Sequence, residues 1–252
     1  MKKISLLIAV CSMSVAAQAQ LIDDFNTTGL SAYTLTPVLY SGGAAPATTT
    51  ISFSRPAGGL QATAANFSAI EQALFLRDDY SLNIGYTLKV DVNWSLGNSQ
   101  DLGLCIASTA TPTAASTNPL GNTRTSLSYT FVGIRGTQEH VVSSGFDGTT
   151  SLSTQQYQPG SGTTTGLFIT RTSATTFDMG YNTGAGDVVL TTYTFANSDV
   201  GNAIGFYADM RANGSIGTFD NLRIEAVPEP SALAFLGLSG LGTILFRRNK
   251  KS

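Results

Sequence analysis

Residues 86–94 read Tyr86-Thr87-Leu88-Lys89-Val90-Asp91-Val92-Asn93-Trp94. Apolar and polar side chains alternate along this stretch, so Leu88, Val90 and Val92 face one way while Lys89 and Asp91 face the other. Successive side chains of a β-strand point to opposite faces of the sheet, whereas a helix repeats every 3.6 residues. The stretch therefore predicts a strand with one buried and one solvated face.

Similar short runs recur through the body of the chain, separated by segments rich in Gly, Ser, Thr, Asn and Pro. We expect strands at 33–40, 50–53, 73–76, 86–94, 102–107, 127–134, 166–172, 176–181, 188–195, 203–210 and 217–226. The strands flanking Ser173-Ala174 predict a hairpin. The polar segments 42–50, 109–125 and 143–165 are expected to be loops.

No stretch of the body sustains an apolar helical period over three turns. Many strands at short spacing are typical of an all-β sandwich or jelly roll. No internal repeat and no long linker divides the body. We therefore expect one β-sandwich domain over residues 20–226, between an N-terminal signal peptide and a C-terminal sorting segment.

The charge of the body excludes one class of partner. Residues 20–227 hold 8 Lys and Arg against 15 Asp and Glu, a net charge of −7. Nucleic-acid binding depends on clustered basic side chains that displace counterions from phosphates. An acidic body with so few lysines predicts no nucleic-acid partner.

The first 19 residues have the pattern of a secretory signal peptide. Lys2 and Lys3 supply the positive start, and an apolar run from residue 4 follows. Ala17-Gln18-Ala19 is an A-x-A cleavage site, so the mature chain is expected to begin at Gln20. The Sec translocon and signal peptidase are the partners implied, because this type of signal is their substrate.

The C-terminal end carries three features in order. They are Pro228-Glu229-Pro230, an uncharged apolar run at 231–246, and the basic residues Arg247, Arg248, Lys250 and Lys251. Sixteen helical residues extend about 24 Å, and flanking residues with snorkelling basic side chains complete a membrane span. Basic clusters stay in the cytoplasm, so we expect one transmembrane helix with the body outside.

This arrangement resembles the PEP-CTERM sorting signal of Gram-negative bacteria. The resemblance implies that Pro228, Glu229 and Pro230 are recognised by an exosortase, a membrane-embedded cysteine transpeptidase that removes the span. It implies an inner-membrane intermediate, and then a place on the outer surface or in the extracellular matrix. It also implies a link to exopolysaccharide and biofilm production, with exopolysaccharide as a further partner.

A second resemblance concerns the body. The start Leu21-Ile22-Asp23-Asp24-Phe25, the hairpin 167–181 and the end Phe219-Asp220-Asn221-Leu222-Arg223-Ile224 are similar to a concanavalin-A/laminin-G-like jelly roll. In that fold the first and last strands lie side by side. If those strands pair here, Asp23, Asp24, Asp220 and Asn221 come close together. The oxygens of these four side chains would suit a structural calcium ion. The alternative is that the four residues are ordinary edge and turn residues.

The residues of catalytic chemistry are sparse. The mature chain keeps one cysteine, Cys105, within an apolar run that predicts a buried thiol, and one histidine, His140, expected on the surface. No G-x-S-x-G elbow occurs, and no two Glu residues have the E-x-D-x-x-E spacing of jelly-roll glycosidases. We expect no enzyme activity and no cofactor other than that structural calcium.

Exposed aromatic rings would indicate a sugar-binding surface, because rings stack on sugars. Tyr157 lies in a polar segment and is the best candidate, while Trp94 is in phase with Val90 and predicts core packing. Tyr181, Tyr193 and Tyr207 are further candidates.

Three functions remain open. The first is an exported, non-enzymatic surface or matrix protein; the second is a lectin-like carbohydrate-binding module; the third is a glycan-active enzyme.

Overall fold

The computed structural model describes residues 19–26, 29–40, 50–56, 58–64, 71–94, 101–110, 115–117, 123–125, 127–136, 140–158, 163–210 and 217–227. They fall within one compact unit, Ala19–Val227. Its elements are β1 (Gln20–Asp23), the short 3₁₀ helix η1 (Leu30–Ala32), β2 (Thr34–Tyr40), β3 (Ile51–Ser54), β4 (Gln61–Ala64), β5 (Glu71–Arg77), β6 (Tyr86–Trp94), β7 (Asp101–Ala107), β8 (Ala115–Thr117), β9 (Thr123–Thr125), β10 (Ser128–Arg135), β11 (His140–Asp147), β12 (Gln155–Tyr157), β13 (Gly166–Arg171), β14 (Thr176–Asn182), β15 (Asp187–Thr194), β16 (Ala203–Met210) and β17 (Gly217–Ala226).

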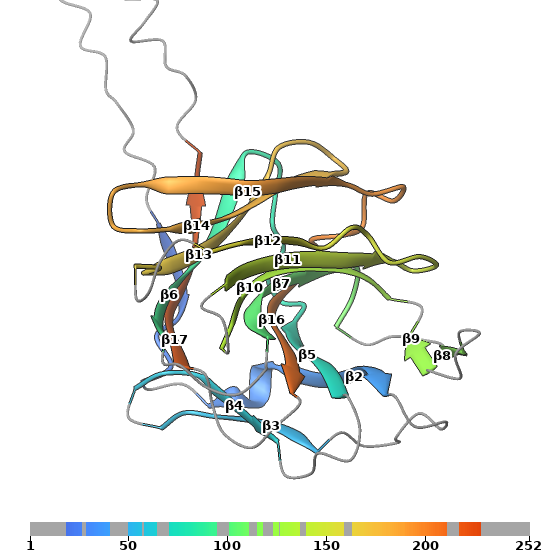
Figure 1. Ribbon diagram of the computed structural model, residues 1–252, viewed down its shortest axis with the longest axis horizontal. Coiled ribbons are helices and arrows are strands. Elements are labelled where there is room, and N and C mark those ends of the chain that lie inside the picture. Colours follow the sequence, from blue (N-terminus) through green and yellow to red (C-terminus); the bar gives the residue numbers. More distant parts are fainter. Residues whose placement is uncertain are drawn as a thin grey trace, which may run out of the picture. The chain divides into compact units, whose positions relative to one another are not determined.

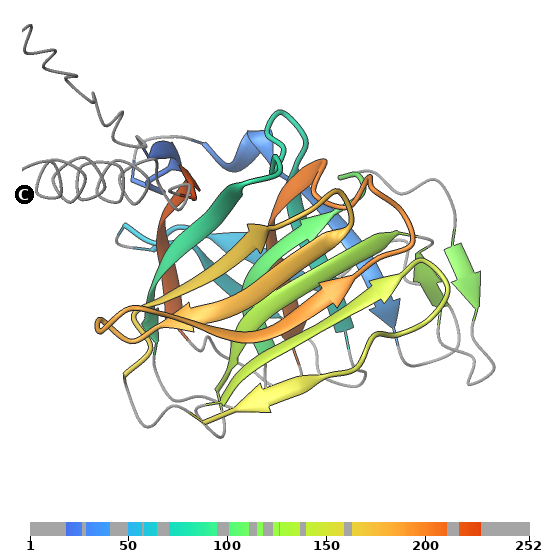
Figure 2. The same ribbon diagram turned by 90° about the horizontal axis from the view of Figure 1, so that it is seen from above.

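Two antiparallel sheets form the layers of a sandwich (Figures 1 and 2). The six-stranded sheet has the order β1-β17-β6-β13-β14-β15, and the nine-stranded sheet has the order β12-β11-β10-β7-β16-β5-β2-β9-β8. β3 and β4 form a separate hairpin, and the neighbouring Leu60 makes two backbone hydrogen bonds with Phe219 of β17. The expected all-β sandwich is confirmed in the described part of the chain.

The main core lies between the two sheets. It takes the alternate side chains of β6 and β13, such as Leu88, Val90 and Ile169, and those of β7 and β16 on the facing sheet, such as Leu104 and Phe206. All five are almost fully buried. Burying such side chains is the main force that holds two sheets together.

The nine-stranded sheet also buries apolar side chains on its outer face. Val38, Leu74, Cys105, Phe131 and Tyr207 belong to this second cluster. Every residue of β7 and β16 is buried as a result. This explains why those two strands are apolar on both faces, whereas β6 alternates.

The strand predictions hold for the strongly patterned runs. β6, β16 and β17 have the predicted bounds, and the predicted hairpin is formed by β13 and β14. The expectation that 109–125 and 143–165 are loops is wrong in part, because β8, β9, most of β11 and β12 lie within them.

The missed strand β11 has a physical explanation. Ser143 and Gly145 made its sequence resemble a loop, but both face the sandwich interior. The Ser143 carbonyl accepts a hydrogen bond of 3.1 Å from the Tyr193 hydroxyl. A Cβ at Gly145 would lie 2.9 Å from both Leu152 Cδ1 and the Tyr129 carbonyl oxygen. Tertiary contacts thus require small residues where strand propensity would favour large ones.

Candidate functional site

The strands that carry the predicted calcium ligands do pair, since β1 lies antiparallel to β17. The side chains, however, have separate partners. The buried Asp23 carboxylate accepts hydrogen bonds from the Phe25 backbone N–H at 2.8 Å and from the Tyr33 hydroxyl at 3.3 Å. It also lies 4.0 Å from the Arg77 guanidinium. Asp23 therefore belongs to a buried cluster that joins β1 to β5.

Arg77 organises this cluster. Its guanidinium makes two hydrogen bonds of 2.7 Å to Asp79 and lies over the rings of Tyr33 and Tyr80, at 5.2 and 4.7 Å from their centroids. Burial and the neighbouring Asp23 carboxylate raise the pKa of Tyr33. Such a stacked and paired arginine is a rigid structural contact.

The other three predicted ligands also have separate partners. Asp24 accepts a hydrogen bond from the backbone N–H of Asn26, and Asp220 accepts one from that of Asn221. The Asn221 amide donates to Asp91 at 2.9 Å. Within the described residues no group of three or more His, Cys, Asp or Glu is placed to hold a metal ion. Calcium binding stays a prediction, supported only by the strand pairing.

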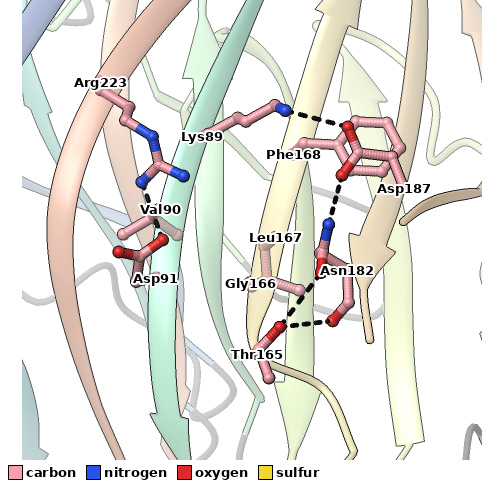
Figure 3. A pocket seen from close by; sticks show the side chains of 10 residues that line it. All are labelled: Lys89, Val90, Asp91, Thr165, Gly166, Leu167, Phe168, Asn182, Asp187 and Arg223. Carbon is pink, nitrogen blue, oxygen red and sulfur yellow. Dashed lines mark hydrogen bonds and ion pairs between the residues drawn. The ribbon is translucent and has the colours of Figure 1, made fainter. Parts of the chain in front are cut away.

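A polar hollow of about 160 Å³ opens on the outer face of the six-stranded sheet (Figure 3). It is lined by Lys89, Val90, Asp91, Thr165, Gly166, Leu167, Phe168, Asn182, Asp187 and Arg223. Its floor follows from the strand register, because Gly166 lies between Asp91 on β6 and Asn182 on β14. Glycine has no side chain to fill the space between those two polar groups. We call this the six-strand hollow.

Ion pairs connect the charged groups around the six-strand hollow. Lys89 Nζ lies 3.0 Å from Asp187 and 3.1 Å from Glu225. Arg223 lies 2.9 Å from the same Glu225 and 2.8 Å from Asp91. Asn182 donates to Asp187 at 2.8 Å, as Figure 3 shows. The cations and carboxylates of β6, β15 and β17 thus satisfy one another.

The electrostatics keep this network charged. Burial disfavours the ionised forms of Asp187 and Glu225, but the hydrogen bonds they accept outweigh it, and the pKa of each carboxyl is lowered. Burial likewise opposes the charges of Lys89 and Arg223, yet their carboxylate partners raise the pKa of both groups. A carboxyl with a lowered pKa is a poor proton donor near neutrality. The hollow is suited to holding a polar molecule by hydrogen bonds.

A second hollow, of about 190 Å³, lies on the outer face of the nine-stranded sheet. Four of its lining residues occupy one row across neighbouring strands, because Arg135 lies opposite Asp101, Asp101 opposite Asp209, and Asp209 opposite Gln72. Arg135 makes two hydrogen bonds of 2.6 Å to Asp101, and the Gln72 amide donates to Asp209 at 2.9 Å. Both carboxylates are buried. We call this the nine-strand hollow.

Aromatic rings form the apolar wall of the nine-strand hollow. Phe131 and Tyr207 stack with centroids 3.8 Å apart and planes at 9°, and Tyr129 lies 6.2 Å from Tyr207. Tyr207 lies opposite Gly103, which itself lies opposite Gly133. The two glycines add no side chain beside the rings, and their strands approach closely there. Polar groups beside an aromatic wall are a common composition of small-molecule sites.

The candidate residues predicted from the sequence do not include Asp101, Asp209, Arg135 or Gln72. Each stands at or next to the end of a different strand, and only the register brings them into one row. The one available signal was that polar residues 101 and 209 border two runs that are otherwise apolar. That signal gives no pairing between the strands.

The aromatic candidates differ in exposure. Tyr157, on the edge strand β12, is 51% exposed, and its ring stacks on Tyr181 with centroids 5.7 Å apart. Tyr181, Tyr193 and Tyr207 are buried, so the expectation that they are exposed candidates is wrong. The first two belong to the main core, and Tyr207 stacks on Phe131. Trp94 packs against the main core, as predicted.

Cys105 is fully buried, which confirms the predicted inert thiol, and burial raises its pKa well above the ordinary value. A thiol is nucleophilic only as the thiolate, so a raised pKa removes that chemistry. His140 begins β11 and is half-buried, where a surface position was predicted. It lies at the edge of the described segment 140–158.

The signal peptide and the sorting segment lie mostly outside the described residues. Ala17, the sorting residues Pro228, Glu229 and Pro230, the span at 231–246 and the basic residues Arg247, Arg248, Lys250 and Lys251 are not described. Ala19 and Gln20 are described, and Gln20 is the first residue of β1. In the part of the chain that the structure covers, no helix has the length and apolar character to cross a membrane.

Comparison with known proteins gives one assignment. Residues 226–251 match the family model of the PEP-CTERM protein-sorting motif. No curated protein matches the chain. A solved structure, the protein of unknown function SO2946 from Shewanella oneidensis MR-1, is similar at 13% identity with a TM-score of 0.38, over 84% of this chain and 86% of that one. A similarity of that size carries no argument about function. The motif implies export to the cell envelope or surface and processing by an exosortase, and the chain is thus a protein with a β-sandwich body that carries a PEP-CTERM sorting motif.

Proposed function

We propose that this protein is a non-enzymatic surface or matrix protein, delivered by exosortase sorting and associated there with exopolysaccharide and biofilm. The body is the delivered cargo, and residues 1–19 and 227–252 are its N-terminal export signal and C-terminal sorting signal. The match to the sorting motif supports the sorting part directly. The association with exopolysaccharide rests on what the PEP-CTERM resemblance implies and on the polar hollows of the body.

The proposal rests mainly on the position at which the last strand of the sandwich ends. β17 ends at Ala226, and the match to the sorting motif begins at that same residue. Val227 still donates a backbone hydrogen bond of 2.8 Å to the Gly85 carbonyl. The sorting signal therefore follows the folded body without a linker. A span that is removed after sorting can be cut away there without loss of any strand.

The inner-membrane intermediate is part of the proposal. The apolar run at 231–246 holds the precursor in the membrane, and Arg247, Arg248, Lys250 and Lys251 remain in the cytoplasm. Pro228-Glu229-Pro230 then lies just outside the span, within reach of a membrane-embedded transpeptidase. The two prolines lack backbone N–H groups and favour extended backbone, which suits an extended strip in a protease groove.

Replacing Pro228-Glu229-Pro230 with three alanines tests the proposal in a host that carries the cognate exosortase. The variant should be exported normally but keep its span, so the precursor with its C-terminal tag accumulates in the membrane fraction. A matched control combines Asn197→Ala with Ser198→Ala in the exposed loop after β15, which also creates three consecutive alanines because residue 196 is already alanine. The control should be processed like the wild type. Processing of the triple-alanine variant at the normal rate would show that the segment is a plain anchor.

The nine-strand hollow favours a second candidate function, carbohydrate binding. It combines an aromatic wall with the carboxylates of Asp101 and Asp209 and the amide of Gln72. The carboxylates can accept hydrogen bonds from sugar hydroxyls, and the amide can donate to them or accept from them. Tyr157, exposed on the edge strand of the same sheet, offers a separate ring for stacking, because it lies opposite the inward-facing Val141 and not on the face of the hollow. A lectin-like body would explain retention in a polysaccharide matrix without catalysis.

A pull-down of the mature chain on exopolysaccharide tests this candidate. Gln72→Ala should lower retention several-fold if the nine-strand hollow holds the sugar, and Tyr157→Ala should do so if the exposed ring at the sheet edge holds it. Asn182→Ala, which alters the six-strand hollow, is the matched control and should leave retention unchanged. Loss of retention only in the control would indicate that the sugar binds to the six-stranded sheet. If the wild type itself is not retained, the lectin function is ruled out.

A further inference from the structure

The end of the six-stranded sheet where the described chain ends carries exposed apolar side chains. Ile84 is 56% exposed, Tyr86 39% and Val227 41%. They are neighbours, since the Val227 N–H bonds to the carbonyl of Gly85, between Ile84 and Tyr86, and Tyr86 lies opposite Ala226. We call these three residues the apolar rim.

The distance from the apolar rim to the sorting segment is short. Val227 is followed by Pro228-Glu229-Pro230, and the apolar run begins at residue 231. Four residues span at most about 14 Å even when fully extended. The headgroup layer beside the hydrocarbon core is about 5–8 Å thick. A membrane-held chain therefore keeps this end of the body at, or just above, the lipid headgroups.

The charged groups next to the apolar rim are already engaged. Glu225, two residues before Val227, is paired with both Lys89 and Arg223. Arg171, which lies opposite Tyr86, turns its guanidinium to backbone carbonyls, among them that of Leu82. Approach of this part of the body to lipid therefore does not strip water from the charged side chains of Glu225 and Arg171 while they lack a partner.

Acidic side chains also lie in the loop that carries Ile84 and in the loop that follows β15. Asp78 and Asp199 are exposed on two loops joined by the hydrogen bond from Leu82 N–H to the Gly201 carbonyl. Anionic lipids would repel these groups, whereas a zwitterionic surface would not. A tyrosine beside aliphatic side chains is also the composition found at membrane–water interfaces.

We propose that Ile84, Tyr86 and Val227 form a membrane-contacting rim, which rests the body on a zwitterionic lipid surface while the C-terminal segment is still inserted. This inference rests on the proposed membrane-held intermediate. The rim is too small to bind lipid strongly alone, and the short connection supplies the local concentration that makes the contact persistent. The contact orients the body, so that Pro228-Glu229-Pro230 emerges directly at the membrane surface.

The test uses the mature chain, residues 20–252, reconstituted into phosphatidylcholine vesicles. An environment-sensitive dye is attached to Ile84→Cys or, as the matched control, to Ala185→Cys. Ala185 is exposed in the loop between β14 and β15, at the opposite end of the same sheet. Cys105 is fully buried and should not react with the dye.

The dye at position 84 should shift to shorter emission wavelengths on vesicles and be quenched by lipids with a nitroxide on the headgroup. The dye at 185 should show neither effect. If the protein floats with the vesicles but both dyes behave alike, the rim proposal fails while the anchor stands. If the protein does not float with the vesicles, the membrane-held intermediate fails, and the rim proposal fails with it.

A further variant distinguishes lipid contact made by the apolar side chains from proximity of the loop to the lipid that the short connection alone imposes. A dye at Asn83→Cys reports on the same loop, with the rim intact or with Ile84→Ser and Val227→Ser added. The double substitution should abolish most of the spectral shift while flotation is unchanged. An undiminished shift would show that the short connection alone brings the loop to the lipid, and would overturn the role of the rim.

Discussion

Gln20 lies directly opposite Ile224 in the antiparallel pairing of β1 with β17. The residue predicted to begin the mature chain therefore belongs to the same strand pair that leads to the sorting signal. Both ends of the described chain, Ala19 and Val227, extend from this one end of the strand pair. Export and sorting signals are thus attached next to each other on the folded body.

The first prediction concerns the mature N-terminus. Cleavage after Ala19 leaves β1 complete, because that strand begins at Gln20. We expect N-terminal sequencing or mass spectrometry of the exported protein to find Gln20 first. An exported form that keeps Met1, or one that begins inside β1, would contradict the assignment of the signal peptide.

The second prediction concerns the close approach of two glycines. A Cβ added at Gly103 would lie 2.2 Å from the Val132 carbonyl oxygen and 2.5 Å from Gly133 Cα, both backbone atoms. Gly103→Ala should therefore force β7 and β10 apart and lower the free energy of unfolding by about 3 kcal/mol. Urea unfolding followed by fluorescence measures the change.

Gly29→Ala is the matched control for that substitution. Its Cβ would meet only ordinary contacts, the nearest being Ser31 Oγ at 3.7 Å. The unfolding free energy should change by no more than about 0.5 kcal/mol. Equal effects of the two substitutions would show that the approach of the strands does not limit the side chain at position 103.

The third prediction concerns a buried arginine. Arg171 donates hydrogen bonds to the carbonyls of Leu82, Ser173, Ala174 and Ser198, with distances between 2.6 and 3.3 Å. Arg171→Met leaves these carbonyls without their donor and should cost about 2–4 kcal/mol of unfolding free energy. Thermal or urea unfolding provides the measurement.

Arg223→Met supplies the comparison for Arg171→Met. Arg223 has a side chain that is 25% exposed, and it makes ion pairs on the open face of the six-stranded sheet. Such pairs contribute little in water, so its loss should cost at most about 1 kcal/mol. If Arg223→Met were the more damaging of the two, the structural role given to Arg171 would be wrong.

The fourth prediction concerns acid. Asp147 accepts backbone and side-chain hydrogen bonds from Thr149 and Thr150, and the backbone bond from Thr150 leads in lowering its pKa to about 2. The unfolded-state pKa of Asp is about 3.9, so the ionised carboxylate stabilises the fold above about pH 4. This contribution should be lost as the pH falls from about 4 towards 2.

Asp147→Asn tests the sign of that effect, because the amide keeps an acceptor oxygen but does not titrate. The wild type should be the more stable protein at about pH 6, and the difference in urea midpoint should shrink at about pH 2.5. A difference that stays constant between those pH values would show that the turn does not depend on the charge.

Much of the fold was predictable because burial of one face imposes a period on the sequence of a strand. In β6 the residues Leu88 and Val90 are buried and Lys89 borders the six-strand hollow, as the alternation predicts. β11 was missed because Ser143 and Gly145 are required by Tyr193 and Leu152, which contact them from other segments of the chain. A local pattern contains no information about such partners.

The candidate sites were less predictable for a related reason. Asp101 and Asp209 become neighbours only through the pairing of β7 with β16, which are about a hundred residues apart in the chain. Similarly, Gly166 makes a hollow only because β13 lies between β6 and β14. Tyr157 was found from its polar surroundings alone. The order of strands in a sheet depends on the whole chain, and no single motif specifies it.

The burial of both faces of β7 and β16 has a consequence for how the body opens. Each of these strands pairs with a neighbour on both sides, and both are covered above and below. Hydrogen exchange at their amides should require global unfolding, whereas the edge strands β1 and β15 should exchange through local fraying. The centre of the nine-stranded sheet would then be the most protected unit of the protein. Strand β1, at the edge of the six-stranded sheet, would open before β17, which pairs with β1 on one side and with β6 on the other. The first strand of the mature chain would therefore be freer to move than the strand that leads to the sorting signal.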